Sequence, residues 1–343
     1  MLPANANATP ALAAVPDAPL PADGTPRERL RGAALMATSA LAFSVMSLFV
    51  KMASGELPAM EIVAVRSVAM TVLSLGFLRW AGVPRRGVNR RLLAARGLVG
   101  AGALSLLYAG LGRLPLGDAV TIQNTAPVWT ALFAALALGE RLRVGIVASV
   151  AASLVGVALV ARPAFLFGAD TDGLDPVGVA LVVAAAVLMG LAYTAVRKLR
   201  ETDHPLAIIY ALSWAGILLS VPFALSGGWR WPSAGAWALL GGVAVSTQVG
   251  QWTLTRGLYL LDAATATAVG YVQIVFAFAW GVLVFGDVPS AAQIAGTGVV
   301  LASVLALVAR RPAPRPAPVP VPPVRPGSRP TPRQERLPAH DAR

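Results

Sequence analysis

Residues 108–142 read YAGLGRLPLGDAVTIQNTAPVWTALFAALALGERL, and residues 256–287 read RGLYLLDAATATAVGYVQIVFAFAWGVLVFGD. A shift of 147 positions aligns these stretches, pairing Gly110 with Gly257, Leu114 with Leu261, Ala119 with Ala266, Gly139 with Gly286 and Glu140 with Asp287. A shift of 146 pairs Gly32 with Gly178, Val50 with Val196 and Lys51 with Arg197. Matches of Ala, Leu and Gly are common in so biased a sequence, but the two charged pairs are not. The chain therefore contains an internal repeat.

The composition is that of a membrane protein. Of 343 residues, 56% are hydrophobic and only 13% are charged, whereas a soluble domain carries about 25% charged residues. A helix that crosses a bilayer needs about 20 mostly apolar residues. Such runs recur between residues 32 and 309, and they are apolar on all sides rather than on one face. The sequence therefore predicts an all-α polytopic membrane protein.

We expect ten transmembrane helices, arranged as two inverted five-helix repeats. The predicted spans are Gly32–Lys51, Pro58–Arg79, Leu92–Gly112, Leu116–Leu138, Val144–Ala161, Pro176–Val196, Pro205–Ser226, Ala234–Leu258, Ala263–Phe285 and Ala291–Ala309. The predicted domains are a disordered cytoplasmic leader (1–31), the first repeat (32–161), the second repeat (176–309) and a disordered, Pro- and Arg-rich cytoplasmic tail (310–343).

Basic residues gather in alternate connections. With a cytoplasmic N-terminus, the cytoplasmic side receives Arg27, Arg29, Arg31, Arg85, Arg86, Arg90, Arg91, Arg96, Arg141, Arg143, Arg197, Lys198, Arg200, Arg256 and the tail. The outer side keeps only Lys51, Arg113, Arg162 and Arg230. This asymmetry predicts a bacterial-type inner (plasma) membrane protein with both termini in the cytoplasm.

The number of spans in each repeat has a mechanistic consequence. Because five is odd, the second repeat enters the membrane from the opposite side. Inverted repeats are typical of secondary transporters, in which one half rocks against the other and gives alternating access to a site near the midplane.

The two quoted stretches resemble the EamA-type ten-helix members of the drug/metabolite transporter superfamily. The resemblance covers residues 32–309 and rests on the short turn into the fourth span, on Pro127 within it and on the Gly139-Glu140 exit. In the second half, Ile274 stands where a proline often occurs, and Asp287 replaces the usual glutamate. The resemblance implies transport of small organic metabolites or drugs, frequently by efflux and often driven by the proton gradient.

Arg66 is the most informative polar residue in the predicted spans. It lies about eight residues into the second span, which places it roughly 12 Å deep at 1.5 Å per residue. A cation at that depth costs several kcal/mol unless it is paired or hydrated. A binding role would place Arg66 against an anionic or carboxylate-bearing substrate, whereas a structural role would satisfy it with carbonyl groups and helix ends. The sequence leaves both roles open.

Nine polar or aromatic residues are candidates for substrate binding. They are Arg66, Ser44, Ser47, Asn124, Trp129, Tyr193, Gln248, Gln251 and Tyr271. Some share a helix face, as Ser44 and Ser47 do at i and i+3, and others are repeat mates, as Asn124 and Tyr271 are. Aromatic side chains beside amides suit an amphipathic organic molecule. Hydrogen bonds between helices are the competing explanation.

Proton coupling would need a titratable group. Glu61, Asp118 and Asp262 are the candidate carboxylates, and all three lie near the ends of spans. Since acids stabilise helix N-termini, a charge at the start of a helix is the competing interpretation.

Several functions are excluded. The two lysines, Lys51 and Lys198, follow Val50 and Arg197, so no Walker A loop exists. The chain has no cysteine and only two distant histidines, so we expect no metal, no cofactor and no enzyme activity. The expected partners are a small-molecule substrate and the lipid bilayer, and no nucleic acid. Protons as the coupling ion and a homodimer stay open, and a membrane scaffold, channel or lipid flippase-like protein is the alternative function.

Overall fold

The computed structural model describes residues 26–80, 87–137, 144–162, 173–199, 202–258, 260–261 and 263–309. Their regular secondary structure is entirely helical, with α1 (Pro26–Ala53), α2 (Ala59–Trp80), α3 (Arg90–Leu111), α4 (Leu116–Gln123), α5 (Ala126–Ala137), α6 (Val144–Ala161), α8 (Pro176–Leu199), α9 (Pro205–Leu225), α10 (Ala234–Leu258), α11 (Ala263–Gly270), α12 (Val272–Trp280), the π-helix η1 (Gly281–Phe285) and α13 (Ala291–Ala309).

Seven stretches of helix in the described residues are long and apolar enough to cross a membrane. They are Pro26–Ala53, Ala59–Arg79, Arg90–Leu111, Val144–Ala161, Pro176–Leu199, Leu206–Leu225 and Ala268–Phe285. Large apolar side chains point outward, with Val72 and Leu283 63% and 75% exposed, while polar Thr121 and Thr247 are fully buried. Outward apolar surface of this extent suits lipid rather than water. The chain is therefore a multi-pass membrane protein.

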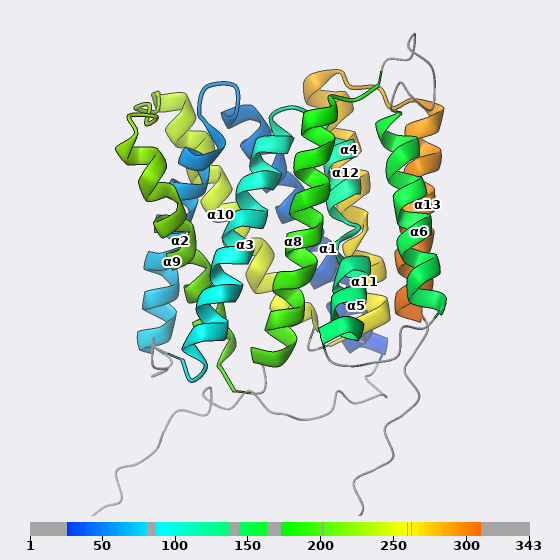
Figure 1. The fold of residues 1–343 in the computed structure, drawn as a ribbon, viewed down its shortest axis with the longest axis horizontal. Helices are drawn as coiled ribbons and strands as arrows, with labels where there is room; N and C mark the ends of the chain where they lie inside the picture. The colour runs from blue at the N-terminus through cyan, green and yellow to red at the C-terminus, as the bar shows by residue number, and fades with distance from the viewer. Residues whose placement is uncertain are drawn as a thin grey trace, which may run out of the picture. The chain divides into compact units, whose positions relative to one another are not determined.

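The two halves pack in a reciprocal pattern. α1 contacts α10, and α3 contacts α8, so the first helix of each half meets the third helix of the other half. Of the remaining helices, α2 packs on its equivalent α9 and α6 on its equivalent α13, while the two interrupted fourth spans meet through α4 and α12. In Figure 1, α1 begins at the lower end of the drawn helices and α8 at the upper end, so equivalent helices run in opposite directions. This arrangement is that of two inverted, two-fold-related halves.

Atomic contacts repeat the same symmetry. A Cβ added to Gly257 would lie 3.4 Å from the carbonyl oxygen of Gly32, and one added to Gly110 would lie 3.4 Å from that of Gly178. Gly32 and Gly178 are repeat mates in sequence, as are Gly110 and Gly257, so one contact occurs in two copies. Small residues let the backbones of membrane helices approach this closely.

Two of the predicted spans are interrupted. The sequence predicts one helix over Leu116–Leu138, but α4 ends at Gln123 and α5 begins at Ala126. Pro127 lacks the N–H group that would donate to the preceding turn, which explains the break. The predicted span Ala263–Phe285 is likewise interrupted at Tyr271. Ile274 occupies the position of the expected proline there, so the second break does not depend on proline.

The first helix starts earlier than predicted. α1 begins at Pro26 rather than Gly32 and takes in the end of the predicted leader. Proline is well suited to the first turn of a helix, and Glu28 adds the acidic residue that this turn favours. The rest of the leader, the tail, the Gly139-Glu140 exit and Asp262 lie outside the described residues.

Candidate functional site

A cavity of about 400 Å³ lies between the two halves. Helices α1, α2 and α3 of the first half and α8, α9 and α10 of the second half contribute to its wall. Both helix breaks reach it as well, through Asn124, Ala126 and Pro127 in the first half and through Gly270 and Tyr271 in the second. The cavity is therefore built by both repeats, at the level where their fourth helices are interrupted.

The cavity lies toward one end of the helices. We call this the cavity end, where α1 and α3 begin, and we call the opposite end, marked by Glu56 and Arg113, the closed end. The cavity-lining residues of α1 lie between Met36 and Met46. Beyond them, fully buried apolar side chains fill the space toward the closed end: Val50, Ala53, Leu111, Leu114 and Leu116. The site is thus separated from the closed end by packed core.

Five of the nine predicted binding residues line the cavity, namely Arg66, Asn124, Tyr193, Gln251 and Tyr271. Arg66 is 7% exposed, and its Nε donates to Oγ1 of Thr247 across 3.4 Å. The repeat mates Asn124 and Tyr271 meet directly, since the Tyr271 hydroxyl donates to the Asn124 carbonyl at 3.4 Å. These two repeat mates therefore meet in the wall of the same cavity.

The other four predicted residues are not part of the cavity wall. Ser44 and Ser47 donate to carbonyls of their own helix, at 2.7 Å to Leu41 and 3.0 Å to Phe43. The indole N–H of Trp129 donates to Thr125 Oγ1 within α5 and the preceding turn, at 3.3 Å. Gln248 is partly buried on α10, where Gln251 reaches the cavity instead. Local hydrogen bonding to the preceding turn explains why the two serines do not contribute.

One residue that lines the cavity was grouped with the loop charges in the sequence analysis. Arg96 was counted among the cytoplasmic positive charges, but it lies inside α3, is 8% exposed and lines the cavity. A Cβ added to Gly100 would lie 2.6 Å from Arg96 Nη1, so the guanidinium lies along the α3 surface that this glycine leaves open. The signal was present in the sequence, because Arg96 falls within the predicted third span.

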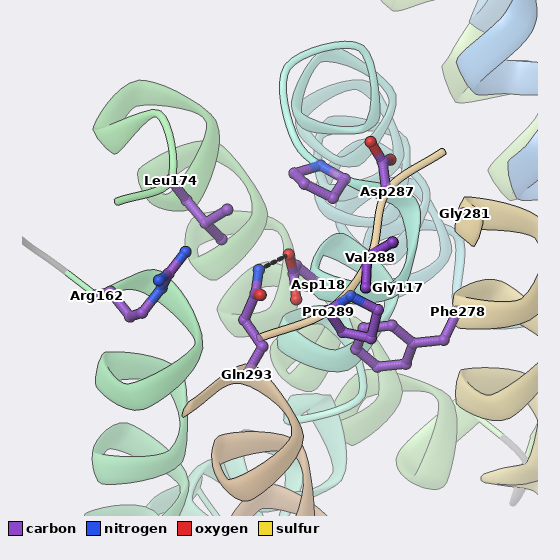
Figure 2. Close-up of a pocket in the computed structure, with 11 residues that line it drawn as sticks. Gly117, Asp118, Arg162, Leu174, Phe278, Gly281, Asp287, Val288, Pro289 and Gln293 are labelled. Carbon is purple, nitrogen blue, oxygen red and sulfur yellow. Dashed lines mark hydrogen bonds between the residues drawn. The ribbon is translucent and has the colours of Figure 1, made fainter. Parts of the chain in front are cut away.

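A second, smaller pocket of about 250 Å³ lies at the closed end (Figure 2). Asp118 of α4 is 1% exposed, and its Oδ2 accepts a hydrogen bond of 2.6 Å from Nε2 of Gln293 on α13. Its Oδ1 has no hydrogen-bond partner among the described residues. Arg162 and Asp287 also line this pocket. Asp118 does occupy the first turn of α4, as expected of a helix-start charge, but it is buried between helices of the two halves.

Further polar contacts join the halves at the closed end. Arg113 Nη1 and Asp175 Oδ2 form an ion pair of 3.2 Å, and the backbone N–H of Arg230 donates to Glu61 Oε2 at 3.0 Å. Glu61 is therefore buried in a contact between the halves, away from the cavity wall. Lys51 also lies here, where its Nζ donates to the Leu114 carbonyl at 2.5 Å.

One contact between the halves occurs at both ends. Glu56 accepts hydrogen bonds of 2.8 Å from the backbone N–H and the hydroxyl of Ser233 at the closed end. At the cavity end, Asp203 accepts from the backbone N–H groups of Val88 and Asn89, at 2.6 and 3.2 Å. Glu56 and Asp203 are 147 positions apart, so they are repeat mates. In each half, the loop after the first helix is therefore tied to the loop before the third helix of the other half.

Metal binding finds no support in the part of the chain that the structure describes. No group of three or more His, Cys, Asp or Glu side chains there could hold a metal ion. His204, one of the two histidines, caps α9, and its Nδ1 accepts from the Leu206 backbone N–H at 3.2 Å.

Comparisons with known proteins agree with this architecture. The model of the EamA-like transporter family matches the chain twice, over residues 30–162 and 176–309. The chain is 31% identical over 278 residues to the pseudopaline exporter CntI of Pseudomonas aeruginosa, covering 80% of this chain and 95% of the exporter. It is 29% identical to human solute carrier family 35 member G1, covering 77% of this chain and 75% of that protein.

A third relative is the riboflavin transporter of Rhizobium johnstonii, at 25% identity over 82% of this chain and 92% of that protein. A solved crystal structure matches with a TM-score of 0.54 and 20% identity, covering 80% of this chain and 96% of the other, which supports the fold alone. The two repeats that the sequence alignment predicted are confirmed. The chain is a membrane transporter, and it belongs to the EamA-like transporter family.

Proposed function

We propose that this chain is a secondary carrier that exports small amphipathic organic molecules across the inner membrane by alternating access. The observation that carries the proposal is the cavity between two inverted halves, which both halves line and which packed core separates from the closed end. A scaffold needs no such cavity, and a channel needs no core across its path. We infer that Arg66, Asn124, Tyr193, Gln251 and Tyr271 contact the substrate.

The proposed carrier has ten spans in two domains, over 32–161 and 176–309. α4 with α5 forms one span, and α11 with α12 and η1 forms another, so each half contributes five. The reciprocal packing supports this count, because each described helix of one half has an equivalent in the other. The broken fourth helices suit a binding site, since interrupted backbone within a membrane is tolerated where it lines a cavity.

Transport would require the closed end to open. The contacts that we expect to separate are those without an equivalent at the cavity end, above all Asp118 with Gln293 and Arg113 with Asp175. The Glu56 and Asp203 contacts occur at both ends, and we expect them to persist as hinges.

The direction that we propose for transport is export. Basic residues such as Arg90, Arg91, Arg197 and Lys198 lie at the helix ends nearest the cavity, which supports a cytoplasmic cavity end under the positive-inside rule. A cavity that faces the cytoplasm would load the substrate of an exporter or release that of an importer. Export is supported by the name of the pseudopaline exporter, a relative of this chain.

Proton coupling is part of the proposal, with Asp118 as the carrier. Intramembrane carboxylates are the usual components of proton relays in transporters, and Asp118 combines burial with an unpartnered oxygen. Asp118→Asn should abolish uphill transport driven by a pH gradient while leaving substrate exchange without a gradient intact. Loss of both activities would identify Asp118 as structural.

Flux measurements in proteoliposomes test the carrier function. We expect saturable flux that one substrate molecule accelerates from the opposite side, and we expect Arg66→Ala to abolish it. Arg79→Ala is the matched control, because Arg79 is exposed on the same helix. Flux that rises linearly with concentration would indicate a channel, and the absence of flux for every solute would leave the scaffold as the better account.

A further inference from the structure

We propose that the substrate is an organic anion, whose carboxylate groups lie between Arg66 and Arg96. This inference rests on the proposed transport function and names its substrate class. It starts from the charge of the cavity wall. Among the described residues that line the cavity, these two arginines are the charged ones, and no aspartate or glutamate is present. The wall therefore carries two positive charges and no counter-charge.

The Arg96 guanidinium is buried in the cavity wall with two of its nitrogen atoms unpartnered among the described residues. Arg96 is 8% exposed, yet its Nε and Nη1 atoms have no hydrogen-bond partner within the described part of the chain. An unpaired buried cation costs several kcal/mol. A guanidinium offers a planar pair of N–H donors that matches the two oxygens of a carboxylate. A bound carboxylate would satisfy both unpartnered groups at once.

Arg66 has spare donor capacity as well. Among the described residues, its Nε donates to the Thr247 hydroxyl at 3.4 Å, which is at the long limit for a hydrogen bond. A neutral hydroxyl does not balance the charge. The two arginines come from adjacent helices of the same half and reach the same cavity. Two cations without counter-charges suit a substrate with two negative charges best.

Four buried or partly buried carboxylates among the described residues lie away from this cavity wall. Asp118 and Asp287 line the smaller pocket at the closed end, and Glu61 accepts from the Arg230 backbone at that end. The Asp203 carboxylate accepts from two backbone N–H groups in the loop before α3. Each of these four groups lies outside the cavity wall.

The other residues of the cavity wall indicate the chemistry of the rest of the substrate molecule. Phe43, Met36, Met46 and Leu104 supply apolar surface, and the amides of Asn124 and Gln251 supply neutral hydrogen-bonding groups. A volume of about 400 Å³ falls in the range of small-molecule sites. The substrate is therefore an anion on a partly apolar body, and a cationic substrate would meet two like charges.

A matched set of compounds tests the sign of the charge. The purified full-length chain would be titrated in detergent with four compounds. Benzylsuccinate carries two negative charges and N-acetylphenylalanine carries one. N-acetylphenylalaninamide is neutral, and phenylalaninamide carries one positive charge. Thermal unfolding reports binding, since a ligand of the folded state raises the Tm. We expect the two anions to raise the Tm, benzylsuccinate more strongly, and the other two compounds to leave it unchanged.

Arg96→Met tests the site, with Arg91→Met as the control on the exposed face of the same helix. Arg96→Met should weaken benzylsuccinate binding about tenfold or more, as expected for a lost charged hydrogen bond. Without ligand, Arg96→Met should raise the Tm, because it removes an unpaired buried charge. Arg91→Met should change neither value.

Three results would overturn the proposal: equal stabilisation by the neutral or cationic compound, stabilisation by none of the four, or a lower Tm of ligand-free Arg96→Met. The last result would mark Arg96 as structural. Failure of the carrier function would look different, because saturable flux would then be absent for neutral and cationic solutes as well as for anions.

Discussion

The hydrogen bond between Gln293 and Asp118 gives a quantitative prediction for the closed end. Gln293→Leu removes the amide that donates to Asp118 Oδ2 at 2.6 Å, and Oδ1 already has no partner among the described residues. A hydrogen bond to a charged group contributes about 1.5–3 kcal/mol. A loss of about 2 kcal/mol from the closed arrangement corresponds to a roughly thirtyfold increase in the population that is open at this end.

Cysteine labelling measures this population. The chain has no cysteine, so Thr121→Cys places a single thiol on a fully buried position of α4. We expect a membrane-impermeant maleimide, added from the closed end, to react about thirtyfold faster when Gln293→Leu is also present. Asp118→Asn, added to the same protein, should return the rate toward its starting value, because the unpaired charge is gone.

A control separates this effect from weakening of the helix start. Gln293 also caps α13, since its Oε1 accepts from the Ser290 backbone N–H at 2.7 Å and its own N–H donates to Ser290 Oγ. Ser290→Ala loses part of this capping without touching Asp118. An unchanged labelling rate in Gln293→Leu, or an equal increase in Ser290→Ala, would refute the reasoning.

Three further predictions follow from particular contacts. The backbone and hydroxyl of Ser233 hold the pKa of Glu56 below its usual value. At neutral pH, Glu56→Gln should therefore have a lower Tm in detergent than the unmodified chain. This difference in Tm should disappear as the pH falls through the lowered pKa. Gly110→Leu should lower the stability by about 1–3 kcal/mol through overpacking of α3 on α8, whereas Gly76→Leu, with open space around it, should not. Gln251→Ala should alter the half-saturating substrate concentration without loss of expression, and unchanged transport kinetics would remove Gln251 from the site.

The repeat and the family could be predicted from the sequence because both depend on aligned residues and on hydropathy. Gly32 and Gly178 are aligned in the repeat, as are Gly110 and Gly257, but the close approaches join Gly32 to Gly257 and Gly110 to Gly178, which the alignment alone does not predict. The helix breaks were less accessible. Hydropathy does not register a two-residue interruption, and the break at Tyr271 occurs without the proline that marks its counterpart near Pro127.

Some of the residues that line the cavity were named from the sequence, and others were not. Polar side chains deep in a span are costly unless they face inward, and Arg66 and Gln251 do line the cavity. Ser44 and Ser47 were chosen on the same basis, but a serine can satisfy itself on its own helix, which the sequence does not reveal. Arg96 was missed because it lies close enough to the start of α3 to be counted with the loop charges.

A reversible cross-link tests the central claim of alternating access most directly. The hydroxyls of Thr121 on α4 and Thr297 on α13 lie 3.4 Å apart, and those of Ser153 on α6 and Ser303 on α13 lie 2.6 Å apart. Cysteines at either pair would join the two halves by a disulfide. We expect the Thr121/Thr297 disulfide to stop transport until it is reduced, because it holds the closed end shut, and the Ser153/Ser303 disulfide to permit transport, because α6 and α13 remain packed. Full transport with the Thr121/Thr297 disulfide formed would contradict the account.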